Sequence, residues 1–89
     1  MEYGTILATK GVADEMKENL AFAQEVIAAF NRYRKNDWGD LCQEDKDLND
    51  MAARTGERIL AAYETSKGKL WIITEWDRSA TTILFPSEY

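Results

Sequence analysis

Carboxylates are the residues of this chain best suited to do chemistry, and they are concentrated between residues 37 and 50. This segment holds six acids and a single base, Lys46, so its charge of −5 equals the net charge of the whole chain. Such a segment either attracts a cationic protein surface or hydrates the exposed side of a helix, whose first turns favour negative charge. The residue types allow both interpretations. The acids are Asp37, Asp40, Glu44, Asp45, Asp47 and Asp50.

The charge density of this acidic segment is comparable with that of nucleic acid. If the segment were one helix, it would rise ~21 Å and its carboxylates would lie ~3.5 Å apart, which is about the charge spacing of a single nucleic-acid strand. Trp38 lies at its start. A tryptophan ringed by charge resembles an interface anchor, although it would also suit the core at a turn. We therefore predict that Trp38 and the six acids form a protein-binding site.

The chain lacks the side chains that most enzymes use. It has no histidine and one cysteine, which excludes a Cys–His nucleophile and a structural zinc site. Cys42 lies among acids, whereas reactive cysteines lie in electropositive surroundings. The stretch 66–69 lacks the first glycine and the helix of a phosphate-binding loop. We expect a protein that is not an enzyme and that holds no cofactor or metal.

Two weaker patterns of acids have ordinary explanations. The segment 45–56 opens like an EF-hand loop, but it lacks the glycine at the sixth position and the glutamate at the twelfth. Glu75 and Asp77 share a strand face, with Glu64 expected opposite them, and paired carboxylates can do acid–base work. Surface charges on a hairpin explain these three residues better.

Length and composition predict one cytoplasmic domain over residues 1–89. The single cysteine fits a reducing compartment. We expect no signal peptide and no membrane span, because no basic start precedes an apolar stretch and no apolar run approaches ~20 residues. With a pI of about 4.6, phosphate groups would be repelled, so bare nucleic acid and anionic lipid are poor partners. A basic protein surface is the better candidate.

The residue pattern predicts a strand and two helices in the first two thirds of the chain. A short β-branched and aromatic run favours a strand over 3–9, and apolar residues at helical spacing predict one helix over 12–34. A turn follows at Asn36–Gly39. Asp40 and Gln43 have the spacing of a capping box, which predicts a second helix from residue 40 to about 55, ended by Gly56.

After Gly56 the chain is predicted to form strands over 58–65, 69–77 and 81–85. The connections between them are short, which is typical of antiparallel neighbours. The predicted fold is therefore α+β with the order β-α-α-β-β-β, a four-stranded, mainly antiparallel sheet that carries two helices on one face.

The predicted sheet is apolar on both faces. A sheet with helices on one side should alternate apolar and polar residues, and aromatic side chains bury ~150–250 Å² each. Either a helix wraps the second face or another subunit covers it, and we favour a homodimer. The candidate interface residues are Ile59, Tyr63, Trp71, Ile73, Trp76 and Phe85.

Three stretches together resemble a known family. They are 4–11 (GTILATKG), 37–41 (DWGDL) and 71–86 (WIITEWDRSATTILFP). They are similar to a family of short bacterial proteins carried on plasmids, integrative elements and phages, whose members are labelled plasmid-related or as a restriction-modification subunit. The resemblance implies a mobile-element context and no specific activity. Members often place a histidine just before the Asp-Trp-Gly run, and this chain has none there.

Two functions follow as hypotheses. The first is a non-enzymatic protein-binding module of a mobile element, an inhibitor of the anti-CRISPR or anti-restriction type, whose acids meet a basic surface on its target. The second is a homodimer that binds or sequesters a small ligand or nucleotide in an aromatic pocket between protomers. The residues predicted for that pocket are Tyr63, Trp71, Trp76 and Arg78.

Overall fold

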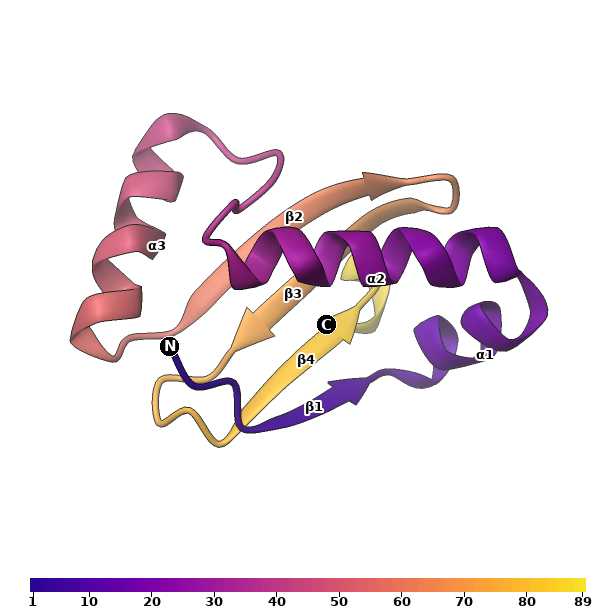
Figure 1. Cartoon of the computed structure of the whole chain (residues 1–89), viewed down its shortest axis with the longest axis horizontal. Coiled ribbons are helices and arrows are strands. Elements are labelled where there is room, and N and C mark those ends of the chain that lie inside the picture. Colours follow the sequence, from indigo (N-terminus) through magenta and orange to yellow (C-terminus); the bar gives the residue numbers. More distant parts are fainter.

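A four-stranded mixed sheet lies at the centre of the protein, and helix α2 crosses in front of one of its faces (Figure 1). The computed structural model describes all 89 residues. The elements are β1 (Thr5–Ala8), α1 (Lys10–Glu18), α2 (Leu20–Arg34), α3 (Gln43–Thr55), β2 (Ile59–Thr65), β3 (Gly68–Thr74), β4 (Ala80–Leu84) and a short 3-10 turn, η1 (Pro86–Glu88). The α+β class is confirmed, with three helices where two were predicted.

The strand order is β1-β4-β3-β2, with antiparallel pairing from β2 to β4 and parallel pairing between β1 and β4. The two hairpins agree with the short connections that predicted them. The position of β1 depends on no local turn, because the chain passes through all three helices before it returns to the sheet. The sheet is therefore mixed.

The helix predicted over 12–34 is two helices that meet at Asn19. The Asn19 amide donates to the Glu15 carbonyl and closes α1, and its side-chain oxygen accepts from the Phe22 amide at 3.0 Å and caps α2. An asparagine that bonds to nearby backbone offers the chain an alternative to continuous helix. The apolar pattern continues across this break, so periodicity alone did not reveal it.

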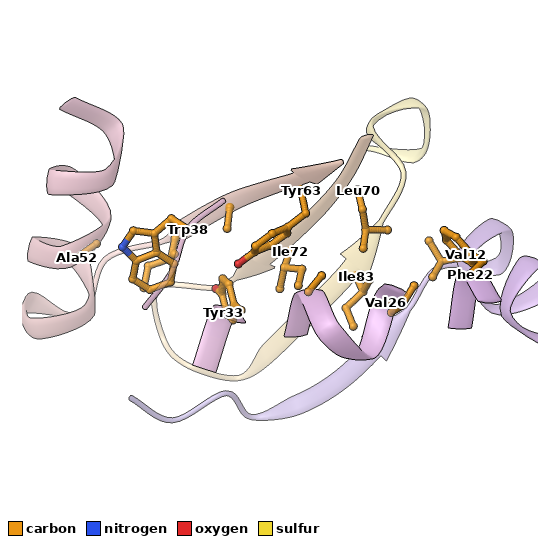
Figure 2. Packing of buried hydrophobic residues seen from close by; sticks show 13 residues of the cluster. Val12, Phe22, Val26, Tyr33, Trp38, Ala52, Tyr63, Leu70, Ile72 and Ile83 are labelled. Atoms are coloured by element: carbon orange, nitrogen blue, oxygen red, sulfur yellow. The ribbon is translucent and has the colours of Figure 1, made fainter. Parts of the chain in front are cut away.

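The core lies between α2 and the face of the sheet that it covers (Figure 2). In β2 and β3, Ala61 lies opposite Ile72 and Ala62 opposite Trp71, and opposed residues point to the same side of a sheet. Odd-numbered residues of β2 and even-numbered residues of β3 therefore face α2. The α2 residues that pack onto them are Phe22, Val26, Ala29 and Tyr33.

A chain of buried hydroxyl groups joins α2 to β3, to β4 and to Tyr3, which precedes β1. The Thr81 hydroxyl donates to the Tyr3 carbonyl at 2.7 Å. Because a threonine has one hydroxyl proton, Thr74 must donate to Thr81 at 2.8 Å, and Tyr33 must donate to Thr74 at 2.6 Å. No buried side-chain polar atom in the structure lacks a partner, so this network places polar groups in the core without leaving any unsatisfied.

The direction of the donors predicts unequal costs when hydroxyls are removed. Thr81→Val deprives the Tyr3 carbonyl of its donor and the Thr74 hydroxyl of its acceptor, which should lower the free energy of unfolding by about 2–3 kcal/mol. Tyr33→Phe leaves Thr74 still bonded to Thr81 and should cost about 1 kcal/mol. Urea denaturation measures both. Thr82→Val is the matched control, because Thr82 makes no side-chain hydrogen bond, and an equal loss in all three variants would refute the network.

The buried phenol of Tyr33 predicts a loss of stability in alkali. Burial raises the pKa of Tyr33 to about 12, and an unfolded tyrosine ionises near pH ~10. The folded state holds the proton more tightly, so the stabilisation is complete below pH ~10 and is lost as the pH rises toward ~12. Burial also raises the pKa of Tyr63. We expect the free energy of unfolding to fall across this window, and to fall less in Tyr33→Phe, in denaturation curves measured at several pH values.

Candidate protein-binding surface

The connection between α2 and α3 is hydrogen-bonded to the outer edge of β2. The Asp40 amide donates to the Ala62 carbonyl at 2.7 Å, the Ala62 amide donates to the Trp38 carbonyl at 3.3 Å, and Gly39 forms a parallel bridge with Ala62. A Cβ on Gly39 would lie 1.9 Å from the Ala62 carbonyl oxygen, and the backbone φ angle of Gly39 is +79°. Only glycine fits this approach.

Trp38 belongs to the core, and its prediction as an exposed anchor is wrong. Its side chain is 2% exposed and makes an edge contact with the Tyr33 ring at 5.3 Å between centroids. The indole Nε1 donates to the Asp50 carboxylate at 2.9 Å. Figure 2 shows the indole between Tyr33 and the α3 residue Ala52. The bridge to β2 explains the burial, because it holds the Asp-Trp-Gly turn against the sheet.

Two of the six predicted acids have structural roles. Asp37 accepts two bonds from the Arg32 guanidinium, at 2.7 and 3.1 Å, and these bonds hold the pKa of Asp37 below its ordinary value. It also accepts from the Gly39 amide at 3.2 Å. Asp50 holds the Trp38 indole. The carboxylates of Asp37 and Asp50 therefore fix the turn and are already engaged.

The other four acids form an exposed group that makes no salt bridge. Glu44 and Asp45 lie in the first turn of α3, where the helix dipole favours negative charge. Asp47 accepts a bond from Gln43 at 2.9 Å. The predicted capping box is wrong, because α3 begins at Gln43 after Cys42 and no side chain caps it. Asp40 belongs to the strand-like connection instead.

Helix α3 buries only Asn49 and Ala52 among its thirteen residues. The Asn49 amide donates to the outward Leu60 carbonyl of β2 at 2.9 Å, so a polar residue faces the sheet because it satisfies an edge group. The buried side of α3 therefore runs through Asn49 and Ala52 and not through the larger apolar residues Leu48 and Met51. As a result, Leu48 and Met51 are 57% and 50% exposed.

A hollow of about 410 Å³ lies between α3 and the edge of β2. Its lining residue Leu60 points to the face of the sheet that lies away from α2. Arg58, at its rim, is 3.3 Å from Glu75 and lies over the Tyr89 ring. Tyr89 in turn contacts Trp71 with 5.6 Å between ring centroids. The hollow is lined by Leu41, Asp45, Leu48, Asn49, Arg58 and Leu60.

The six residues predicted as a dimer interface do not form one surface. Ile59 and Tyr63 are fully buried beneath α2, and Phe85 stacks on Phe22. Trp71 and Ile73 lie on the opposite face, where Ile73 is 2% exposed. The prediction placed odd-numbered residues of β2 and β3 on one face. In the structure, odd-numbered residues of β2 share a face with even-numbered residues of β3. Trp76, which is 67% exposed, lies beyond the end of β3.

Two of the four residues predicted to line a ligand pocket between protomers, Tyr63 and Arg78, make hydrogen bonds within the chain. Tyr63 faces the core, and its hydroxyl donates to the Asp37 carbonyl at 2.7 Å. Arg78 is engaged by backbone: its guanidinium donates to the carbonyls of Ala52, Glu57 and Glu75 at 2.8, 2.7 and 3.0 Å. Arg78 thus ties the last turn of α3 to the β3–β4 turn, a role that no sequence pattern indicated.

The remaining carboxylates do not converge on a site. Glu64 pairs with Lys69, Glu75 pairs with Arg58, and Asp77 accepts from the Ser79 amide. No three residues among the acids and the cysteine are grouped as metal ligands would be. The segment that resembles an EF-hand loop is continuous helix as far as Thr55. None of the helices is both long and apolar enough to cross a bilayer.

Comparison of the chain with protein-family models, with curated proteins and with solved structures finds no significant match.

The three bonds of Arg78 predict a large effect of its removal. Arg78→Ala leaves three carbonyls without a charged donor, and hydrogen bonds to charged groups contribute about 1.5–3 kcal/mol each, so we expect a loss of at least ~2 kcal/mol. Arg34→Ala removes an exposed arginine with no such bonds and should change stability by less than ~0.5 kcal/mol. Thermal and urea denaturation compare the two variants, and equal stabilities would contradict the role of Arg78.

Proposed function

We propose that this protein is a small, non-enzymatic protein-binding module whose partner presents a basic surface to α3 and to the hollow beside it. The observation that carries the proposal is the exposure of α3. This helix buries two residues, and it presents free carboxylates next to the large apolar side chains of Leu48 and Met51. Acidic and apolar groups side by side suit a partner that is both basic and partly apolar.

The acids would supply attraction and orientation. Asp40, Glu44, Asp45 and Asp47 make no salt bridge within the chain, so no internal pair must break before they meet lysine or arginine. Complementary charge of this kind speeds association and selects partners more than it raises affinity. The 37–50 segment carries the whole net charge of −5, so it dominates the long-range field of the protein.

The apolar residues would supply the contact area that holds the complex. Stable interfaces have an apolar centre and a polar rim. Here the hollow, with Leu41, Leu48 and Leu60 in its lining, would form the centre. The exposed acids of α3 would form the rim. Large apolar side chains at half exposure on a charged helix are the kind of surface that marks an interaction site.

The narrower part of the proposal concerns the target. The resemblance to short proteins of mobile elements favours an antagonist of host defence, acting in the cytoplasm. Four exposed carboxylates next to an apolar hollow suit the basic nucleic-acid channel of a nuclease.

The acidic side is tested by charge reversal with a matched control. Glu44→Lys/Asp45→Lys and Glu2→Lys/Glu18→Lys both change the net charge from −5 to −1, because each acid-to-lysine change adds two charges. In pull-downs from a defence-competent bacterial lysate, we expect the first pair to lose the partner and the second to retain it, with circular dichroism unchanged. Binding should weaken with salt, since screening acts beyond ~8–10 Å. Equal binding by both pairs would rule out the acidic surface.

The apolar side is tested by Leu48→Gln, which removes the apolar contact without adding charge. Leu48 is 57% exposed, so stability should change by less than ~0.5 kcal/mol, whereas partner binding should weaken about tenfold or more, the equivalent of ~1.4 kcal/mol.

The defence target is tested by expressing the chain in restriction- or CRISPR-proficient cells. Plating of a targeted phage should rise with the original chain and not with Leu48→Gln. Binding without any rise in plating would retain the module and reject the defence role.

A further inference from the structure

The two edges of the sheet are treated differently. Along β2, the outward groups of Ala62 bond to Trp38 and Asp40, and the Leu60 carbonyl bonds to Asn49. An edge covered in this way cannot accept another strand. The opposite edge, β1, has no neighbour beyond β4 on its other side.

The outward backbone groups of β1 have nothing to pair with in the chain. The amides of Thr5 and Thr9 donate to the carbonyls of Ser79 and Ile83, at 3.1 and 3.0 Å. Since backbone groups alternate along a strand, the N–H and C=O groups of Ile6 point away from β4. All four residues of β1 are exposed, with Ile6 at 52% and Leu7 at 47%.

One flank of α2 is also apolar and partly exposed. On one side of α2, Glu25 bonds to Ser66 of the β2–β3 turn; on the other, Phe30 contacts Tyr3, next to β1. Leu20 and Ile27 lie on the Phe30 side and are 74% and 56% exposed.

The solvent side of α2 carries no charge between residues 20 and 31. A helix surface that faces water normally carries charged residues there. Glu25 is the one charged residue in this stretch, and it is turned to the hairpin. The exposed residues are Leu20, Ala21, Gln24, Ile27, Ala28 and Asn31.

We propose that a second copy of this chain binds along β1 and α2. In a two-fold dimer, β1 pairs antiparallel with its copy and the two sheets join into one of eight strands, with both α2 helices on the same face of the joined sheet and their uncharged flanks toward the junction. Helix α2 contacts β2 more than any other strand, so the pairing of the two strand edges is the main contact, and an exposed edge needs a partner with an edge of the same kind. A two-fold axis supplies that partner, because such an interface is self-complementary.

The distribution of charge favours this edge for self-association. The 37–50 segment, which carries the net charge, is bonded to β2 at the far side of the sheet. Pairing through β1 therefore keeps the two acidic segments at opposite ends of the dimer, whereas pairing through α3 would bring them together. Stable dimers bury about 800 Å² per partner, which is about 15% of the 5299 Å² surface of this chain.

The proposal is tested by mass measurement with two interface variants and a matched control. At about 100 µM, light scattering should give twice the chain mass of 10.2 kDa. Ile6→Pro removes an N–H that β4 does not use, and Ile27→Lys places a positive charge on the α2 flank that each protomer turns toward the junction; each should weaken the dimer at least tenfold. Leu48→Lys makes a similar change at similar exposure, 57% against 56%, and should leave the dimer intact.

Other outcomes would overturn the proposal. A mass of 10.2 kDa for the original chain would refute the dimer, and dissociation by Leu48→Lys alone would place the interface at α3. Circular dichroism of each variant separates dissociation from unfolding. These results are independent of the partner-binding assays, since Leu48 lies outside the proposed dimer contact and Ile27 lies outside the acidic surface.

Discussion

The backbone pairing of residues 38–40 with Ala62 is the constraint on which the rest of the surface depends. Two hydrogen bonds hold this connection on the edge of β2, and the approach is so close that position 39 must be glycine. The pairing turns Trp38 into the core and brings Asp50 of α3 to its indole nitrogen. One short contact thereby sets where α3 begins, which of its sides faces the sheet and which acids remain free.

The same contact explains why a weakly buried helix holds its place. Helix α3 contributes only Asn49 and Ala52 to the interior, so apolar packing alone would fix it poorly. It is held at three points by polar groups instead: Asp50 bonds to the Trp38 indole, Asn49 to the β2 edge, and the Arg78 guanidinium to the last turn. Because these contacts lie on one side of the helix, the other side is available with its leucine and acids. A helix fastened in this way can present a binding surface without a large core beneath it.

Local patterns in the sequence predicted the parts of the fold that depend on local signals. The hairpins followed from short connections, Gly56 ended α3, and the α+β class followed from the order of elements. The break at Asn19, the parallel placement of β1 and the inward turn of Trp38 depend on bonds between residues that no periodicity connects. In the candidate site, the exposed acids were found by composition. The roles of Asp50 and Arg78 were not, because a carboxylate bound to an indole and a guanidinium bound to carbonyls leave no mark in spacing.

The two exposed surfaces of the chain are opposite in character and lie at opposite edges of the sheet. One is acidic and lies over the closed β2 edge; the other, along the open β1 edge, has no charged residue within the strand. Net charge opposes self-association wherever the charges must approach. The pI of this chain is about 4.6, so a second copy can approach an open strand edge only where the acids lie elsewhere. The acidic connection covers the β2 edge, which is the edge nearest the charge. The β1 edge, which is farthest from the charge, stays open. A dimer through β1 would then present two acidic surfaces, one at each end, and a partner with two basic sites could bind both and gain affinity without any new contact.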